Sequence, residues 1–250
     1  MVQLTSIGGV GLSIFAVTSG KGGVGKSCVA AYTASALADL GKKTLLIELG
    51  GPRMMDIITG AEKEILFDAA DVALCRCDPS DAIVQTEINE SLFLMPASVD
   101  VLDCPNYSAA VESLIMGSTA YYEHIVVDGL DFAQVSPNIA DVVLVVTTPD
   151  SLAVRACAVE VRRLLAAGAK NLRLVVNAVP TRILPVIGAQ NLDDIVDQIG
   201  VQLLGVIPQS QILQYCSNNT EQLSRDSITP DVFDNIAARL LGQNRRLLVR

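Results

Sequence analysis

The sequence predicts an α/β fold in which a doubly wound, mostly parallel sheet carries helices on both faces. Three observations lead to this prediction. Short apolar runs, typical of buried strands, alternate with segments of helical spacing along most of the chain. Half of the 250 residues are hydrophobic and only 18% are charged, which suits strands that are buried on both sides. A glycine-rich loop joins the first predicted strand to the first predicted helix.

The predicted elements follow one another without a linker rich in Gly, Ser or Pro. Strands are predicted at residues 12–18, 44–49, 92–96, 124–128, 141–147, 172–177 and 203–207. Helices are predicted at 26–40, 107–119, 151–167, 191–199 and 231–241, with shorter helical segments around 67–74 and 79–86. Residues 1–250 are therefore expected to form one domain, with a lead at 1–11 and a short basic and apolar tail at 243–250.

Charge and cysteine usage narrow the classes of function. The net charge of −9 argues against a broad basic face for sequence-independent nucleic-acid binding, so specific nucleic acid is not expected as a partner. The lead lacks a basic start and is not expected to be a signal peptide, and no apolar run is long enough to span a bilayer. The six cysteines show no disulfide-framework spacing. Reduced thiols and a cytoplasmic location are therefore expected.

The loop after the first strand carries the strongest functional signal. It fits the phosphate-loop pattern G-x-x-x-x-G-K-[ST] through Gly20, Gly25, Lys26 and Ser27. Glycines let backbone N–H groups line a cradle for phosphate oxygens, Lys26 supplies a cation to the β- and γ-phosphates, and the Ser27 hydroxyl suits Mg²⁺. We therefore expect ATP or ADP with Mg²⁺. The expected contacts come from Gly20, Lys21, Gly22, Gly23, Val24, Gly25, Lys26, Ser27 and Cys28.

Asp128 ends the predicted strand at 124–128, which is the Walker B arrangement. A carboxylate at that strand end would hold Mg²⁺ through its water shell, next to Ser27. The alternative is an ordinary polar strand terminus. The phosphate loop earlier in the chain makes the Mg²⁺ role the favoured interpretation.

Lys21 is a second lysine that a plain phosphate loop does not need. Together with Gly-Gly-x-Gly-Lys-Ser it resembles the deviant Walker A motif of the MinD/ParA family of ATPases. In that family the early lysine reaches across a dimer interface to the nucleotide of the other subunit. The resemblance implies catalytic roles for Lys21 and Lys26, and a homodimer that forms on ATP.

Later segments extend the resemblance over roughly 15–242, and they are most similar to the MinD branch of the family. The Thr-Thr-Pro-Asp run at 147–150 leads into Val154-Arg155, as in MinD-like sequences. The resemblance implies that Asn177 reads the adenine edge and that Ile207 and Pro208 pack against the base. The alternatives are a strand-end cap for Asn177 and a plain turn for Ile207 and Pro208.

Two departures concern hydrolysis. Where the family has an Asp-x-Asp segment whose second aspartate positions the attacking water, this chain has Glu48-Leu49-Gly50. The family's small-Pro-Ala-Gly switch after the Walker B aspartate is replaced by the different sequence at 129–132. Because Gly50 cannot orient water, hydrolysis is expected to be slow. Asp56 or Asp131 would have to substitute, and the alternative for each is a solvated loop acid or a cap.

The tail is a third departure. MinD-like proteins usually continue into a basic amphipathic segment that lies on anionic membrane. Here 243–250 places Arg245, Arg246 and Arg250 next to Leu247, Leu248 and Val249. These residues would form at most a weak interfacial helix with peripheral membrane contact, and the alternative is a frayed terminus.

Three functions remain open at this stage. The first is an ATP-dependent switch for cell division or polar placement, with slow hydrolysis and a regulatory or cargo protein as partner. The second is a non-hydrolysing, ATP-clamped scaffold dimer that marks a location for a pilus, flagellar or secretion assembly. The third is a ParA-like positioner of DNA cargo, which the acidic balance disfavours. His124, the sole histidine, is interpreted as a packing residue, and the Cys75–Cys77 pair is a weak metal signal.

Overall fold

The computed structural model describes residues 12–50, 53–61, 65–98, 107–180, 191–219 and 228–248. The strands are β1 Ser13–Thr18, β2 Thr44–Glu48, β3 Val84–Gln85, β4 Leu92–Met95, β5 His124–Asp128, β6 Val142–Thr147, β7 Leu172–Val179 and β8 Leu203–Pro208. The helices are α1 Lys26–Asp39, α2 Met55–Thr59, α3 Ala69–Ala73, α4 Tyr107–Ser118, α5 Ser151–Ala166, α6 Leu192–Ile199, α7 Gln211–Asn219 and α8 Ile228–Leu240. Short 3₁₀ turns cover Pro79–Ala82 (η2) and Pro137–Ile139 (η3).

The strands form one eight-stranded sheet in the order β3-β4-β2-β5-β1-β6-β7-β8. Every pairing is parallel except that of β3 with β4. Parallel neighbours need crossover connections, and the intervening helices supply them. The doubly wound α/β fold expected from the sequence is confirmed.

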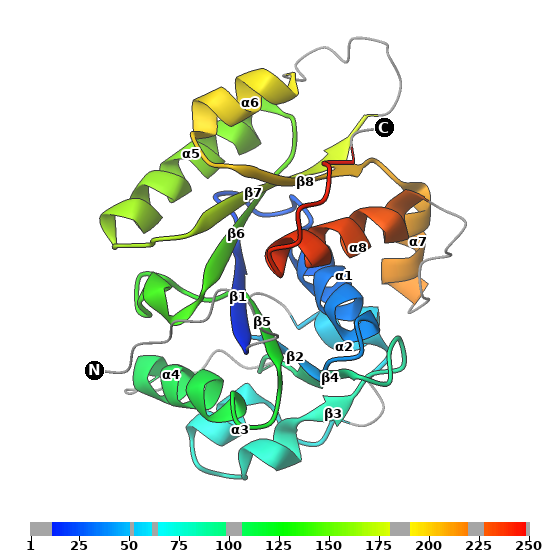
Figure 1. The fold of residues 1–250 in the computed structure, drawn as a ribbon. Helices are drawn as coiled ribbons and strands as arrows, with labels where there is room; N and C mark the ends of the chain where they lie inside the picture. The colour runs from blue at the N-terminus through cyan, green and yellow to red at the C-terminus, as the bar shows by residue number, and fades with distance from the viewer. Residues whose placement is uncertain are drawn as a thin grey trace.

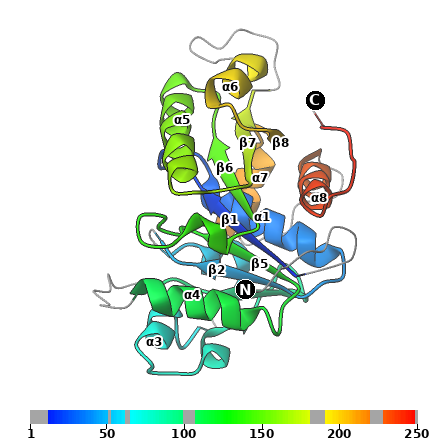
Figure 2. The same ribbon diagram turned by 60° about the vertical axis from the view of Figure 1, so that its left-hand side comes forward.

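Two layers of helices cover the sheet (Figures 1 and 2). One apolar core joins the sheet to α1, α2, α7 and α8, and the other joins it to α3, α4, α5 and α6. Strands β2 and β5, between the layers, are buried along their whole length. This is why the central strands have continuous apolar sequences rather than alternating ones.

Three local features differ from the sequence-based expectation. The helical segment expected at 79–86 is wrong in its second half, because Val84 and Gln85 pair antiparallel with Leu94 and Phe93. Helices α2 and α7 were not expected at all. Within the described ranges, no helix combines the length and the apolar character that a bilayer crossing needs.

The described part of the tail, 243–248, is not helical. Asn235 Nδ2 donates to the Arg246 carbonyl (3.0 Å), and Arg239 Nη1 donates to the Arg245 carbonyl (2.8 Å). Leu248 packs against the core beside α8. The interfacial helix considered for 243–250 is therefore not present over these residues, and Leu248 faces the protein's own core.

Candidate nucleotide-binding site

The predicted site residues meet at the carboxyl edge of the sheet. In the β1–β5 pairing Val17 lies opposite Asp128, so the loop that leaves β1 passes directly over the Walker B strand end. β6 lies on the other side of β1 and β7 lies beyond it. The loop at 19–27, Asp128, the 148–150 turn and Asn177 are therefore brought together from four strands, as expected for a doubly wound sheet.

Asp128 joins the first turn of α1 to the centre of the sheet. Its carboxylate is fully buried, lies 3.1 Å from Lys26 Nζ and accepts a hydrogen bond from Ser27 Oγ (2.7 Å). A buried carboxylate needs such partners, since an unpaired one would lose most of its hydration without compensation. A hydroxyl and a carboxylate side by side are also oxygen ligands that Mg²⁺ accepts, so the residues present fit the metal predicted here.

The glycines of the loop serve different purposes. Gly25 is the N-cap of α1 with φ 84°, and Gly23 has φ 77°, a region that favours glycine. Gly20 lies against α5, where a Cβ would fall 2.1 Å from the Ala156 carbonyl oxygen. Gly22, by contrast, has no atom within 4 Å of a built Cβ, so packing does not require a glycine there. The open space beside Gly22 is what a phosphate cradle needs.

Asn177 supports the loop from the neighbouring strand. Its Nδ2 donates to the Val24 carbonyl (2.9 Å), and the side chain is buried. Ala178 follows with φ 55°, where the β7–β8 register shifts. Asn177 lies inside β7 rather than at its end, so the strand-end alternative is wrong, and its adenine-reading role stays a prediction.

The remaining predicted contacts lie near this edge. Val24 and Ile207 are buried, Cys28 is half-buried in the first turn of α1, and Pro208 ends β8.

Lys21 forms an ion pair with a residue of its own chain. Its Nζ lies 3.5 Å from Asp150 Oδ1, and both side chains are about half exposed. Asp150 also caps α5 by accepting from the Ala153 N–H (3.0 Å). The Thr148 hydroxyl, which donates to Asp150, is the main cause of a lowered pKa for that carboxyl, and Lys21 adds to it. Asp150 was expected only as part of a family-like run, and no sequence pattern predicts its contact with Lys21.

The segments that follow β2 and β5 touch through two glycines. A Cβ on Gly50 would fall 2.6 Å from the Gly129 carbonyl oxygen, and one on Gly129 would fall 2.6 Å from the Gly50 nitrogen. Gly129 also has φ 77°. Leu49 N–H donates to the Asp128 carbonyl (2.9 Å) just before this contact. Position 50 therefore has no room for a side chain unless the backbone of one segment shifts.

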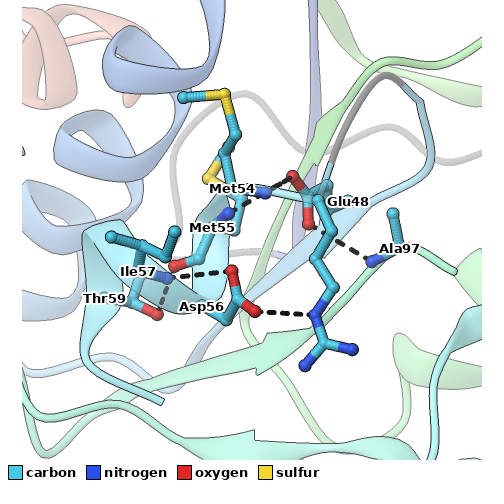
Figure 3. A network of polar contacts seen from close by, with 8 residues as sticks. Glu48, Met54, Met55, Asp56, Ile57, Thr59 and Ala97 are labelled. Carbon is cyan, nitrogen blue, oxygen red and sulfur yellow. Dashed lines mark hydrogen bonds and ion pairs between the residues drawn. The ribbon is translucent and has the colours of Figure 1, made fainter. Parts of the chain in front are cut away.

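Glu48 holds the start of α2 instead of facing solvent (Figure 3). One carboxylate oxygen accepts from the N–H groups of Met54 (2.9 Å) and Met55 (3.2 Å), and the other from Ala97 (3.3 Å). Burial raises the pKa of Glu48, the three N–H groups oppose this rise, and nearby Asp128 adds a smaller one. Glu48 is thus a cap for α2 supplied from the end of β2, six residues before Met54.

The two candidate substitutes for the missing aspartate make local contacts. Asp56 is buried and pairs with Arg53 Nε (2.7 Å). It also accepts from the Ile57 N–H (2.9 Å), as Figure 3 shows. Asp131 accepts from the Ala133 N–H (2.9 Å) and from Gln134 Nε2 (2.8 Å) within its own turn. The contacts of Asp131 favour the alternative that it caps its own turn. Asp56 is buried and ion-paired, so it is not the solvated loop acid that was the alternative for it.

Comparison with known proteins agrees with this geometry. The model of the CobQ/CobB/MinD/ParA nucleotide-binding domain matches residues 15–223. The chain belongs to this family. It is 33% identical over 245 residues to the septum site-determining protein MinD of Synechocystis, covering 92% of this chain and 90% of the relative. It is 30% identical to MinD of Bacillus subtilis, covering 93% of this chain and 90% of the relative.

Solved structures of the family have the same fold. The MinC:MinD cell division complex of Aquifex aeolicus contains a chain that is similar with a TM-score of 0.83 and 30% identity, covering 95% of this chain and 98% of that one. MinD of Pyrococcus horikoshii, solved with Mg-ADP, has a TM-score of 0.77 over 92% of this chain and 96% of that one. Its 20% identity supports likeness of fold alone.

Within this MinD/ParA-type domain, the residues that sequence reasoning missed are Asp150 and Gly129. A Thr-Thr-Pro-Asp run before a helix signals an N-cap, which was a way to find Asp150. No local signal predicts the Gly50–Gly129 contact, because it depends on the register of β2 against β5, where Glu48 lies opposite Asp128.

Proposed function

We propose that this chain is an ATP-dependent positioning switch of the MinD kind, acting in the placement of the cell division site. The observation that carries the proposal is the buried Asp128, held between Lys26 (3.1 Å) and Ser27 (2.7 Å) beneath an open phosphate loop. The MinD relatives from Synechocystis and Bacillus subtilis support the cellular role.

Each residue of the site has a chemical task in this proposal. The loop N–H groups would hold the phosphates, with Lys26 turning from Asp128 toward the β- and γ-phosphates. Ser27 and Asp128 would hold Mg²⁺, which neutralises phosphate charge when bound. Asn177, Ile207 and Pro208 would surround the base, the last two by apolar contact.

ATP-driven dimerisation requires Lys21 to leave Asp150. A half-exposed pair at 3.5 Å is worth little, so a phosphate of a second subunit's nucleotide would compete for this lysine readily. Formation of the homodimer would therefore exchange a contact within one chain for a contact between two chains. A regulatory protein is the expected partner, since an Aquifex aeolicus relative was solved as a MinC:MinD complex.

Hydrolysis is expected to be slow, and this favours a second candidate function. Gly50 brings no carboxylate to the attacking water, and its contact with Gly129 leaves no space for one. In the second candidate the ATP-bound dimer is a lasting scaffold for a polar assembly rather than a cycling switch. The DNA-cargo alternative has no such observation in its favour, and the net charge of −9 weighs against it.

One experiment separates these candidates. Phosphate release with Mg-ATP is measured at several protein concentrations, and the dimer fraction is recorded in the same samples. We expect an ATP-dependent dimer with slow turnover that rises with dimer fraction, and we expect Lys21→Ala to lose both. Lys170→Ala, an exposed lysine outside the site, is the matched control.

The possible outcomes separate the candidates clearly. A dimer without turnover would favour the scaffold over the switch. If the chain neither binds nucleotide nor dimerises, both the switch and the scaffold proposals are wrong.

A further inference from the structure

A groove runs along α4 on the sheet face opposite α1. It consists of two adjoining hollows of about 680 Å³ and 260 Å³ that share Pro79, Ser113 and Leu114. One bank is α4, and the other is formed by α3 and the η2 turn. We call this feature the α4 groove. Its combined length follows a helix of 12 residues, or about three turns.

The α4 bank presents a stripe of mostly small side chains. Ala110, Ser113, Leu114 and Gly117 line the groove at the spacing i, i+3, i+4, i+7, which places them on one side of α4. Tyr121 lines it from the turn that follows the helix. Ser113 and Gly117 are exposed, so a partner can approach the α4 backbone closely. Small residues along one helix face allow a second helix to pack at short range.

Apolar residues form the floor and the far bank. Phe93 and Tyr122 line the larger hollow, with ring centroids 5.5 Å apart, and Ile83 lines it beside them. Val72 and Ala73 line the smaller hollow. These side chains are only partly buried, so an apolar ligand face placed here would remove further apolar surface from water.

The far bank is also strongly acidic. Asp68 and Asp71 lie at the N-cap and in the first turn of α3, and Asp78 and Asp81 hold the corresponding positions of the η2 turn. Their charges also raise the pKa of Cys77, for which burial is the first cause. Asp71 pairs with Arg76 at 3.3 Å. Among the described residues, neither Asp78 nor Asp81 has an ion-pair partner.

Other charged residues lie at the Lys43 end of the groove and on α4. Lys43 lines the larger hollow at the amino end of the sheet. Lys42 pairs with Glu123 beside it at 4.0 Å, and Glu112 is on α4. Lys42 and Lys43 thus lie at one end of the groove. On the α3–η2 bank Arg76 offsets Asp71, and the other three carboxylates leave the described part of that bank with an excess of negative charge.

The groove lies away from the nucleotide site. Tyr121 and Tyr122 of the larger hollow precede the first residue of β5, whereas Asp128 is its last residue, so the larger hollow and the phosphate loop are at opposite ends of this strand. Figure 2 shows α3 and α4 together at one side of the sheet, away from α1. An occupant of the groove would leave the phosphate loop free.

We propose that the α4 groove docks an amphipathic helix of a partner protein, with its apolar face against α4 and Lys or Arg side chains along the α3–η2 bank. Charge complementarity selects this occupant, because an acidic or neutral helix would leave Asp78 and Asp81, which form only backbone capping contacts, without an ion-pair partner. The helix-in-groove mode requires apolar anchors about one turn apart, which the spacing of the α4 stripe matches. The proposal is independent of the nucleotide-dependent function.

The test uses three synthetic 14-residue helical peptides with the same Leu/Ala face and with Lys, Ser or Glu on the other face. Binding to the full chain is followed by fluorescence anisotropy. We expect the Lys peptide to bind at least about tenfold more tightly than the Glu peptide, because like charges at an interface are penalised, with the difference shrinking at high salt.

Two pairs of variants locate the binding. Gly117→Leu fills the groove without strain, since a Cβ there meets nothing within 4 Å. This variant is expected to bind the Lys peptide at least about tenfold more weakly than the wild type does. Ala166→Leu adds the same side chain at an exposed site on α5 and is expected to change nothing. The double variant Asp78→Asn/Asp81→Asn should bind the Lys peptide more weakly. The double variant Asp193→Asn/Asp194→Asn makes the same charge change on α6 and should bind the peptide as the wild type does.

Several results would overturn the proposal. These are no saturable binding of the Lys peptide, equal binding of the Glu peptide, or binding that survives Gly117→Leu. Self-association of the chain that Gly117→Leu abolishes, in the absence of peptide binding, would assign the groove to a second copy instead.

Discussion

At the scale of single residues, the absence of a side chain at Gly50 is enforced by its surroundings. Sequence comparison alone presents Gly50 as a lost aspartate that a substitution would restore. The structure shows that a Cβ at this position would meet the Gly129 carbonyl oxygen at 2.6 Å, and that oxygen belongs to the backbone rather than to a flexible side chain. The segments after β2 and β5 therefore fit each other only as a pair of glycines.

We predict that Gly50→Ala lowers the free energy of unfolding by about 1–3 kcal/mol, the usual range for an overpacked site. Gly129→Ala should cost more, because strain at its φ of 77° adds to the clash. The Gly50→Asp variant should have a lower free energy of unfolding than the wild type and should release phosphate no faster. Urea unfolding and a phosphate assay measure the two effects.

Gly41→Ala is the control for the glycine variants. Its φ is 79° but nothing lies within 4 Å of a built Cβ, so it isolates backbone strain of about 1 kcal/mol. A Gly50→Ala protein as stable as the wild type would show that the segments after β2 and β5 are not packed as described.

At the scale of elements, the long apolar strands were predictable and the short capped helices were not. Strands such as β2 and β5 are buried on both faces, so their three inner residues are all apolar and their carboxyl ends are marked by acids. Helix α2 has five residues, and its cap comes from Glu48, which no local pattern reveals. The two residues of β3 are too few to show an alternating pattern.

The same contrast holds for the site. The phosphate loop and Asp128 were predictable because parallel strands bring their carboxyl ends to one edge. The Lys21–Asp150 pair, the Asn177–Val24 bond and the tail contacts were not, because each depends on side-chain geometry between separate elements.

Helix α8 is expected to hold the tail through Asn235 and Arg239. We predict that Asn235→Ala, which removes the 3.0 Å bond to the Arg246 carbonyl, speeds tryptic cleavage after Arg245 and Arg246 about fivefold. That factor corresponds to about 1 kcal/mol for a lost hydrogen bond, applied to local opening.

Cleavage after the exposed Lys170 serves as the internal control and should keep its rate. If Asn235→Ala left cleavage of the tail unchanged, the described contacts would not be what holds these residues. If the variant instead gained affinity for anionic vesicles, the tail would have lipid-binding capacity that α8 normally conceals.

At the scale of the whole molecule, a buried imidazole makes the free energy of unfolding depend on pH. His124 begins β5 with no exposed surface, and among the described residues neither ring nitrogen has a hydrogen-bond partner. Burial lowers its pKa below the ordinary value of 6.5, Glu123 raises it and Lys42 lowers it slightly. The folded protein thus keeps the ring neutral where the unfolded chain would protonate it.

The direction of the effect follows from proton binding. Between pH 6.5 and the lowered pKa, the unfolded chain binds a proton that the folded protein does not, so stability falls as pH decreases. Glu48 acts in the opposite sense. Its pKa is raised above 4.5, so its stabilising contribution is present below pH 4.5 and is lost as pH rises through the raised value.

We predict that His124→Leu removes the loss of stability below pH 6.5, because leucine fills an apolar site without a titrating group. The free energy of unfolding of the wild type, minus that of the variant, should decrease by up to about 1.4 kcal/mol per pH unit below pH 6.5. This difference cancels the contribution of Glu48, which both proteins share. Urea titrations from pH 8 to pH 5 measure it, and a difference that stays constant over this range would mean that His124 is protonated or solvated in the folded state.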